Sequence, residues 1–308
     1  IIALGVGFLI GVTQATPDMK NTMSRYLIDN NAYDIDVKGT FGLTEGDLDA
    51  LLALKDGNGD PLVESVTPVI STDAAVTAGG HEVVGRLIGI ENLREYANAS
   101  ADAEGGNLNT LTLLEGEWPD AAGEVVVARA SNYFESVNVG DTIALPDTVD
   151  SSLATYGDVY VSKTYTVTGI VSSPDYFYND AREVTTFGSG VVGCVVYGEM
   201  SDVYDLQKSG SLFSYLSNES IMGIIGAEPI TVRYTDCYVK LRGSEKYERF
   251  NEDYKNFVLE GAESLETLGK EQIKVFTDLI AKAEEQGLGG IIAGMGLSAD
   301  SVQWLVLD

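Results

Sequence analysis

The stretch that decides the fold is Leu114–Pro146, LEGEWPDAAGEVVVARASNYFESVNVGDTIALP, followed after an irregular segment by Thr164–Val171, TYTVTGIV. Glu124–Ala128 is a short β-branched run, and Asp141–Leu145 follows a Val-Gly-Asp turn, so each predicts a strand. Tyr165–Val171 alternates with a period of two, which is the pattern of a half-buried strand. This part of the chain is therefore predicted to be β-rich.

The chain before this stretch combines strands with one helix. Tyr33–Gly39, Val63–Ile70 and His81–Ile90 predict strands, and Gly79-Gly80 predicts the turn between the last two. Thr44–Leu54 predicts a helix between the first two strands. The order strand, helix, strand, strand predicts an α+β layer in which helices cover one face of the sheet.

The start of the helix Thr44–Leu54 is well marked. Thr44 is expected to cap it, with Asp47 at the capping-box position, and Leu43 and Leu48 fit a hydrophobic staple. Its buried side is predicted to consist of four leucines: Leu48, Leu51, Leu52 and Leu54.

The α+β pattern resumes after the β-rich stretch. Ser201–Gly226 is predicted to be a loop with a short helix, Thr231–Leu241 a strand, and Ser244–Val258 an amphipathic helix. A second helix, Ser264–Gln286, either packs on the body or opens a coiled-coil arm. We therefore expect the β-rich part, about Leu114 to Ala227, to be inserted into an α+β domain.

The charge of the chain limits its partners. Asp and Glu number 47 against 19 Lys and Arg, which gives a formal net charge of −28. Such an excess repels phosphate backbones and anionic lipid headgroups, so a nucleic-acid partner is not expected. Hydrophobic residues make up 44% of the chain, so a folded body is predicted.

The N-terminal stretch Ile1–Val12, IIALGVGFLIGV, carries no charge. A membrane-spanning helix needs about 20 apolar residues, so this stretch is too short to span alone. It is either a buried helix or the outer end of a membrane helix, and the polar stretch that follows it favours the second interpretation. Gly7 and Gly11 have the spacing of small residues in packed membrane helices.

Cys194 and Cys237 are the two cysteines of the chain. They are expected to form one disulfide bridge or to remain buried free thiols, because a body of this size does not need a covalent staple. The sequence around them does not predict a metal site, and no cofactor is expected.

Asp56, Asn58 and Asp60 have the spacing of the first three oxygen ligands of a calcium loop. The pattern then fails, because Pro61 replaces the required glycine and Thr67 the final glutamate. A polar turn is the simpler interpretation, and a weak calcium site is the alternative.

Two further patterns do not predict catalysis. Gly188, Gly190 and Gly193 match a dinucleotide fingerprint, but the residues on both sides are typical of strands, so a glycine-rich hairpin is favoured. His81 is the only histidine and follows a turn, where an exposed position is expected. No nucleophile elbow and no zinc-binding HExxH motif are present.

Tyr176, Phe177 and Tyr178 form an aromatic cluster in the loop SPDYFYND. Exposed aromatic residues on a loop are suited to binding a partner or ligand. They are equally suited to packing their own loop onto the sheet. Both interpretations remain open.

Most of the chain resembles the extracytoplasmic domain of the permease subunit of MacB/FtsX-like ABC transporters. The segments that carry the resemblance are LEGEWPDAAGEVVVA (114–128), VNVGDTIAL (137–145), YTVTGIV (165–171), TTFGSGVVGCVVY (185–197) and YTDCYVKLRG (234–243).

The resemblance implies a discontinuous α+β fold. Residues 1–30 would be the end of a membrane helix and a stalk, and residues 31–113 with 228–260 an α+β porter-like domain. Residues 114–227 would be an inserted β-rich sabre-like domain. Residues 261–308 would form an added helical arm that returns towards the membrane.

In such permeases the external domain is not an enzyme, and the ATPase is a separate cytoplasmic subunit. The resemblance therefore implies a cell-membrane protein with this domain outside, flanking membrane helices and a dimeric transporter. Gly116, Gly140 and Gly169 would have backbone roles in turns or close approaches.

The leading hypothesis is the extracellular domain of an FtsX-like permease that couples ATP hydrolysis to cargo handling or partner regulation. A free extracellular binding or adhesion protein is the second hypothesis. A secreted hydrolase that depends on His81 or an acidic pair is the third.

Overall fold

The computed structural model describes residues 17–98, 107–129, 137–146, 159–176, 185, 190–294, 298 and 301–307. The predicted apolar helix Ile1–Val12 and the aromatic residues Phe177 and Tyr178 lie outside these residues.

The described part of the chain is a mixed α+β structure. Its strands are β1 (Ile35–Leu43), β2 (Val63–Ala78), β3 (His81–Ile90), β4 (Thr112–Gly116), β5 (Glu124–Ala128), β6 (Thr142–Ala144), β7 (Thr164–Ser172), β8 (Cys194–Glu199), β9 (Tyr234–Leu241) and β10 (Trp304–Leu307). Its α-helices, after the helical residues 17–29, are α2 (Glu45–Ala53), α3 (Met200–Val203), α4 (Leu212–Leu216), α5 (Glu219–Ile225), α6 (Glu252–Gln272), α7 (Lys274–Glu285) and α8 (Gly289–Gly294). Short 3-10 helices are η1 (Leu93–Asn98), η2 (Pro174–Tyr176) and η4 (Ser244–Lys246).

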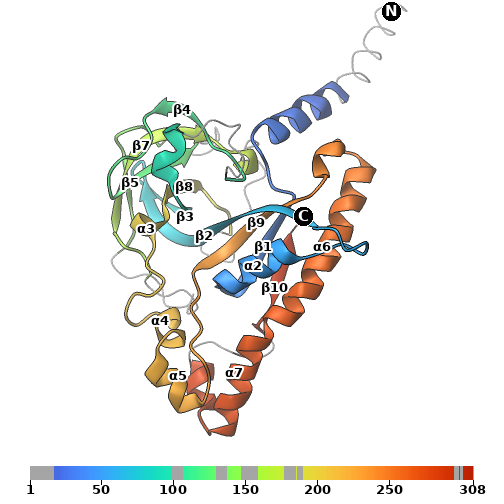
Figure 1. Ribbon diagram of the computed structural model, residues 1–308. Coiled ribbons are helices and arrows are strands. Elements are labelled where there is room, and N and C mark those ends of the chain that lie inside the picture. The colour runs from blue at the N-terminus through green and yellow to red at the C-terminus, as the bar shows by residue number, and fades with distance from the viewer. Residues whose placement is uncertain are drawn as a thin grey trace, which may run out of the picture.

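The described strands form one large mixed sheet in the order β10-β1-β9-β2-β3-β8-β5-β7-β4, and β6 pairs with β2 and β7. The β3–β8 and β5–β7 pairs are parallel, and the other pairs are antiparallel. Strand β2 links the two parts of the sheet: its first half pairs with β9 and its second half with β3. Figure 1 shows the β-rich part and the long helix α6 on opposite sides of the molecule.

The sheet is packed on both faces. The larger hydrophobic cluster includes Leu48 and Leu51 of α2, Leu265 of α6 and Phe276 of α7, so these helices cover one face. The rings of Phe276 and Phe41 pack with their centroids 6.0 Å apart. A smaller cluster on other strand positions includes Leu108 and Leu111 from the segment before β4. The predicted helix-covered α+β layer is confirmed.

The start of α2 is also confirmed. The Thr44 side chain accepts a hydrogen bond from the Asp47 N–H, and the Asp47 carboxylate accepts one from the Thr44 N–H, which completes the capping box. The prediction that Leu52 is buried is wrong, because its side chain is 45% exposed.

The predicted helices near the C-terminus have different boundaries in the structure. The prediction of one helix over Ser244–Val258 is wrong: Ser244–Lys246 is a 3-10 turn, and α6 begins after Asn251, whose side chain accepts from the Tyr254 N–H as an N-cap. The predicted start of the second helix at Ser264 is wrong as well, because α6 continues through Gly261 to Gln272.

Gly261 allows α6 to lie close to the sheet. A Cβ at this position would lie 2.4 Å from Cδ1 of Leu241 on β9, closer than any real contact. Further along the helix, a Cβ at Gly269 would lie 3.0 Å from the Trp304 side chain of β10. Both glycines therefore allow α6 to pack closely on the sheet.

The predicted strands are present in the sheet with different ends: β1 continues to Leu43 rather than Gly39, and β9 begins at Tyr234 rather than Thr231. Strand β2 extends beyond the predicted end at Ile70 to Ala78, where Gly79 and Gly80 form the turn with positive φ angles. Residues Trp304–Leu307, which the sequence did not predict to be a strand, pair with β1 as β10. The predicted loop with one short helix over Ser201–Gly226 contains α4 and α5 as well as the end of α3.

Gly116 and Gly169 make the close approach that their sequence context predicts. A Cβ on Gly116 would lie 2.1 Å from the carbonyl oxygen of Thr168, and its φ is +78°. A Cβ on Gly169 would lie 2.7 Å from the carbonyl oxygen of Glu117. Gly140 has a φ of +93° and lies in a turn.

Cys194 and Cys237 are both buried and are not joined by a disulfide, so the structure favours the second of the two alternatives for the cysteines. Burial and the nearby carboxylates of Asp36 and Asp236 raise the pKa of the Cys237 thiol. None of the helices in the described ranges is long and apolar enough to cross a membrane.

Candidate functional site

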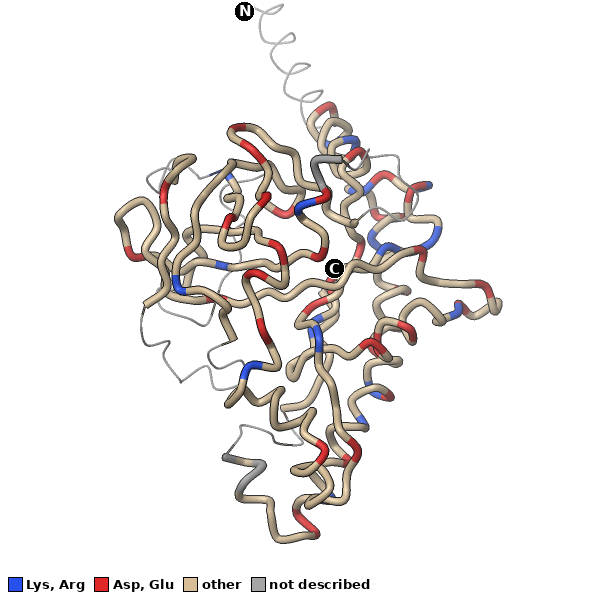
Figure 2. The backbone as a smooth tube through the Cα atoms, turned by 60° about the vertical axis from the view of Figure 1, so that its left-hand side comes forward, with Lys and Arg blue, Asp and Glu red and all other residues tan. Residues whose placement is uncertain are grey.

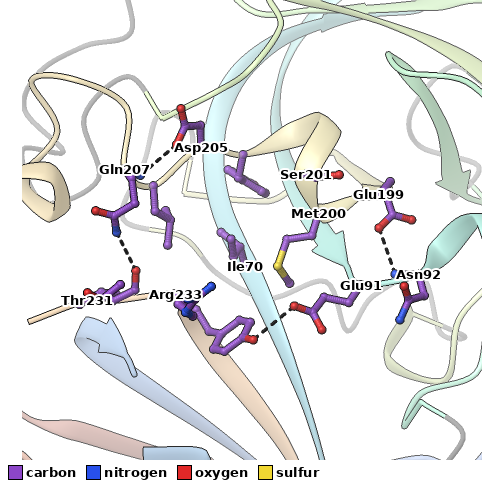
Figure 3. A pocket seen from close by; sticks show the side chains of 14 residues that line it. Ile70, Glu91, Asn92, Glu199, Met200, Ser201, Asp205, Gln207, Thr231 and Arg233 are labelled. Atoms are coloured by element: carbon purple, nitrogen blue, oxygen red, sulfur yellow. Dashed lines mark hydrogen bonds between the residues drawn. The ribbon is translucent and has the colours of Figure 1, made fainter. Parts of the chain in front are cut away.

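The candidate site is a pocket where strands β2 and β9 separate. The two strands pair as far as Val69 and Asp236. Beyond this point the Thr235 hydroxyl accepts from the Ser71 N–H at 2.7 Å, and β2 continues beside β3. The chain before β9 instead stays beside β1, because the Arg233 N–H donates to the Leu43 carbonyl at 2.9 Å. A pocket of about 560 Å³ lies between Ile70 of β2 and residues 231–234 (Figure 3).

The floor of the pocket is apolar and buried. It consists of Ile70, Met200, Tyr204, Leu206, Val232 and Tyr234. The Tyr204 hydroxyl lies 2.5 Å from the Leu87 carbonyl, to which it donates, and 3.0 Å from the Thr72 hydroxyl. Burial raises the pKa of Tyr204 well above its usual value, so this phenol stays neutral and holds α3 against β3.

One end of the pocket carries glutamates around Tyr234. The Tyr234 hydroxyl lies 3.1 Å from Oε1 of Glu45 and 3.2 Å from Oε1 of Glu91. Burial and the two carboxylates raise the pKa of this hydroxyl. Oε1 of Glu45 also lies 3.4 Å from Nε of Arg233, so a carboxylate lies beside the guanidinium that lines the pocket.

The other carboxylates that line the pocket, Glu199 and Asp205, accept hydrogen bonds from nearby backbone N–H groups. Both oxygens of Glu199 accept backbone N–H groups, from Asn92 at 3.0 Å and from Arg94 at 3.2 Å, so this side chain fixes the turn after β3. Asp205 accepts the Gln207 N–H at 3.0 Å and is exposed. Glu91 and Asp205 lie on opposite sides of Ile70 in Figure 3.

The pocket presents hydroxyl, carboxylate and apolar groups to a ligand. Its hydroxyl groups belong to Ser201 and Thr231 on the exposed rim and to tyrosines with raised pKa values, and none of the described residues that line it is a histidine or cysteine. No group of three or more His, Cys, Asp or Glu side chains that could hold a metal occurs in the part of the chain that the structure describes.

The predicted calcium ligands Asp56, Asn58 and Asp60 lie in an exposed turn far along the chain from the pocket. Oδ1 of Asp56 accepts the backbone N–H groups of Asn58 and Asp60, each at 2.9 Å. These hydrogen bonds lower the pKa of Asp56. These residues therefore form a polar turn, as the simpler interpretation predicts. Calcium binding by them stays a prediction.

Of the three aromatic candidates, Tyr176 is described and lies at the end of η2. Its hydroxyl accepts from Nη1 of Arg86 at 3.5 Å, and Arg86 forms a two-bond pair with Asp73 at 2.8 and 2.9 Å. Tyr176 thus packs against its own sheet. The role of Phe177 and Tyr178 as partner contacts stays a prediction. His81 begins β3 at an exposed position, as expected.

Sequence reasoning did not find the pocket. Its lining comes from the middle of β2, the ends of β3 and β8, α3 with the loop after it, and the segment before β9, which are far apart in the chain. The one local signal is the alternation of apolar Val232 and Tyr234 with polar Thr231 and Arg233. In the structure the first two residues are buried and the other two are exposed, as in a half-buried strand.

These features define a mixed α+β domain with an open pocket whose rim carries carboxylates. A family model described as the MacB-like periplasmic core domain matches residues 1–252, so the chain belongs to this family. It is accordingly an extracytoplasmic domain of a MacB/FtsX-like ABC transporter, a kind of domain that is typically non-catalytic.

Two solved structures are similar to this chain. The periplasmic region of MacB from Actinobacillus actinomycetemcomitans has 13% identity and a TM-score of 0.31, and the match covers 89% of this chain and 87% of that one. The extracellular domain of the noncanonic ABC-type transporter YknZ from Gram-positive bacteria has 9% identity and a TM-score of 0.31, with 73% and 91% covered. A comparison with curated proteins gives no match.

Proposed function

We propose that this domain couples ATP hydrolysis by a cytoplasmic ABC ATPase to cargo handling or partner regulation outside the membrane. The observation that carries the proposal is the family match over residues 1–252. In this proposal the ATPase is a separate subunit, the full-length permease reaches it through its flanking membrane helices, and two permeases form the transporter. The domain itself catalyses no reaction.

The helical residues 17–29 provide a physical route for such coupling, because they and the following turn bond to both parts of the sheet. The Tyr26 hydroxyl lies 2.7 Å from the Ser172 hydroxyl at the end of β7. In the turn, the Asn31 carbonyl accepts from the Asn109 N–H at 2.9 Å, and its side chain accepts from Nζ of Lys240 on β9 at 2.8 Å. A displacement of this helix therefore acts on both parts together.

Arg249 is the second anchor of this helix. Its backbone N–H donates to the Ser24 hydroxyl at 3.3 Å, and its guanidinium donates to the Tyr33 carbonyl at 2.8 Å. The same guanidinium lies 3.1 Å from the fully buried carboxylate of Asp34, which also accepts from the Tyr254 hydroxyl of α6 at 2.8 Å. Motion of residues 17–29 is thereby tied to α6.

The test is a distance measurement in the full-length permease with its ATPase in nanodiscs. Spin labels are placed on Met19→Cys and Ile224→Cys, both 69% exposed, and labelled permease is diluted with unlabelled permease. The native cysteines are buried, which disfavours their labelling. We expect the distance distribution to change between the nucleotide-free state and the ATP–vanadate state.

The control pair is Leu114→Cys and Leu305→Cys, which lie on strands β4 and β10 of the same sheet and are 41% exposed each. Its distance is expected to stay constant. Active ATP hydrolysis with no change in the Met19–Ile224 distance would contradict coupling through this domain.

A further inference from the structure

The segment before β9 presents a backbone edge to the pocket. The backbone N–H of Arg233 donates a hydrogen bond to the Leu43 carbonyl of β1. The carbonyl of the preceding residue, Val232, faces the pocket and accepts a hydrogen bond from Nε2 of Gln207 at 3.0 Å. In a β-sheet, such a carbonyl accepts its hydrogen bond from a backbone N–H of the neighbouring strand. A side-chain amide therefore takes the place of a missing strand.

Gln207 is an exposed residue that is held by few contacts. Its Oε1 accepts from the Ser217 hydroxyl at 2.6 Å, and its backbone N–H donates to Asp205. A ligand that offers a backbone N–H can replace the amide at the Val232 carbonyl, because the exchange keeps one hydrogen bond to that carbonyl. The pocket is thus built as an edge that another strand can extend.

The rim of the pocket selects for positive charge. Among the described residues, carboxylates line it from Glu91, Glu199 and Asp205, against the guanidinium of Arg233, which lies 3.4 Å from the carboxylate of Glu45. Lys208, next to Gln207, directs its Nζ to the Tyr160 carbonyl at 3.0 Å. The whole chain adds to this field with its net charge of −28.

The apolar floor completes the requirements on the ligand. Side chains of an extended segment alternate between two faces. In a bound segment, apolar side chains on one face would cover Ile70 and Met200. Basic side chains on the other face would reach Glu91 and Asp205 at the two ends of the pocket. A simple amine lacks the apolar side chains, and an acidic peptide is repelled by the rim.

We propose that this pocket binds an extended peptide segment with alternating apolar and basic residues, which pairs with the Val232 edge in place of the Gln207 amide. The proposal deepens the proposed function by giving the site a ligand class, and it rests on that function only for its role in the transporter. Peptide binding is measured on the 308-residue chain without ATPase or membrane. Its failure is therefore distinct from a failure of coupling.

The probe is the capped tetrapeptide Ac-Val-Lys-Val-Lys-NH2, titrated calorimetrically into the 308-residue chain. We expect saturable binding that weakens as NaCl is raised, because the rim charges are screened. The comparison ligands are Ac-Val-Glu-Val-Glu-NH2 and the diamine cadaverine, which should both bind at least tenfold more weakly. Equal binding of either, or no binding of the lysine peptide at millimolar concentration, overturns the proposal.

Variants locate the binding. Glu91→Gln and Asp205→Asn keep an acceptor oxygen for their internal hydrogen bonds and should each weaken binding about two- to fivefold. Glu263→Gln removes the same charge from an exposed position on α6 and should leave the affinity unchanged. Equal weakening by Glu263→Gln would show a diffuse charge effect and would overturn the site.

Gln207→Ala distinguishes strand pairing from simple charge attraction. Removing the amide frees the Val232 carbonyl and should strengthen binding of the lysine peptide severalfold, whereas a merely structural role of Gln207 predicts weaker binding. Unchanged or weaker binding in a variant with an unaltered circular dichroism spectrum overturns pairing at this edge.

Discussion

At the scale of single residues, the strongest constraints are charges buried between the sheet and its covering elements. Asp34 is fully buried and is paired with Arg249 at 3.1 Å, and its remaining oxygen accepts from the Leu241 N–H at 2.8 Å. Asp36 and Asp236 are also buried and share Lys38, at 3.0 and 3.1 Å. Such groups cost stability unless every partner stays in place.

Arg249→Ala should lower the free energy of unfolding by about 3–5 kcal/mol, because it leaves the Asp34 carboxylate buried without its cation. The measurement is urea unfolding monitored by circular dichroism. Arg25→Ala removes an exposed arginine of the helical residues 17–29 and should change the same quantity by less than about 0.5 kcal/mol. A similar effect of the two substitutions would show that the Asp34 pair is not a stabilising contact.

Asp36 makes stability dependent on pH. Burial, followed by the nearby charge of Asp236, raises the pKa of Asp36 from 3.8 to about 8, against the opposing effect of Lys38, and Asp175 adds to the rise. The unfolded state loses this proton at a lower pH than the folded state. The contribution of Asp36 to stability is therefore full below pH 3.8 and declines as pH rises towards about 8.

Asp36→Asn should accordingly remove most of this decline. One oxygen of Asp36 has no hydrogen-bond partner among the described residues, so the neutral amide loses little there. We expect the variant to be more stable than the original chain at pH 8 and similar to it at pH 4, as measured by urea unfolding at both values. Parallel pH profiles for the two chains would exclude Asp36 as the source.

At the scale of elements, the long helix α6 depends on glycine where it meets the sheet. Alanine is a better helix former than glycine by about 1 kcal/mol, so local preference alone favours replacement. Packing opposes the replacement of Gly261 by alanine, since a Cβ at this position would lie 2.4 Å from the Leu241 side chain. The two effects can be separated with glycines in different surroundings.

Gly261→Ala should destabilise the chain by about 1–3 kcal/mol through overpacking. Gly223→Ala in α5 is the matched control, because no atom lies within 4 Å of the position that its Cβ would take, and it should stabilise by up to about 1 kcal/mol. The measurement is the midpoint of urea unfolding for each variant. A stabilising Gly261→Ala would mean that α6 stands further from β9 than described.

The same elements show how far the sequence predicts the fold. The capping box at Thr44 and Asp47 and the strand Glu124–Ala128 depend on neighbouring residues, and both were predicted correctly. The predicted break in the helix between Val258 and Ser264 was wrong, because α6 continues through this segment, where Gly261 makes room for the Leu241 side chain. Leu241 belongs to β9, which lies twenty residues earlier in the chain.

The pocket was beyond sequence reasoning for a related reason. Glu91, Asp205 and Val232 have no shared spacing, and they meet only because β2 leaves β9 after Val69. A pattern read along one strand does not contain the point where two strands separate. The division into residues 31–113 with 228–260 and 114–227 stays a prediction.

At the scale of the whole molecule, the dominant property is net negative charge. Figure 2 shows Asp and Glu distributed over all parts of the described chain, with Lys and Arg much sparser. The net charge of −28 places the folded state under self-repulsion that the expanded unfolded state relieves. Screening by salt should therefore favour folding.

Raising NaCl from about 0.01 M to about 0.15 M shortens the Debye length from roughly 30 Å to roughly 8 Å and should raise the melting temperature by a few degrees. The measurement is thermal unfolding by circular dichroism at constant pH. Choline chloride at equal ionic strength should have the same effect, because the expected cause is screening and not binding of sodium. A melting temperature that falls with either salt contradicts the expectation.

The shared strand β2 also determines what happens when the chain is divided. Residues 85–90 of β3 pair in parallel with β8, and the far end of β2 pairs with β6. A chain shortened by excision of residues 114–227 would keep β2 and β3 but lose both of these partners. It would carry an unpaired strand edge with buried apolar residues such as Leu87 and Ile88 uncovered, and such edges nucleate aggregation. Production of this shortened chain should therefore yield insoluble material unless β3 is given a substitute strand.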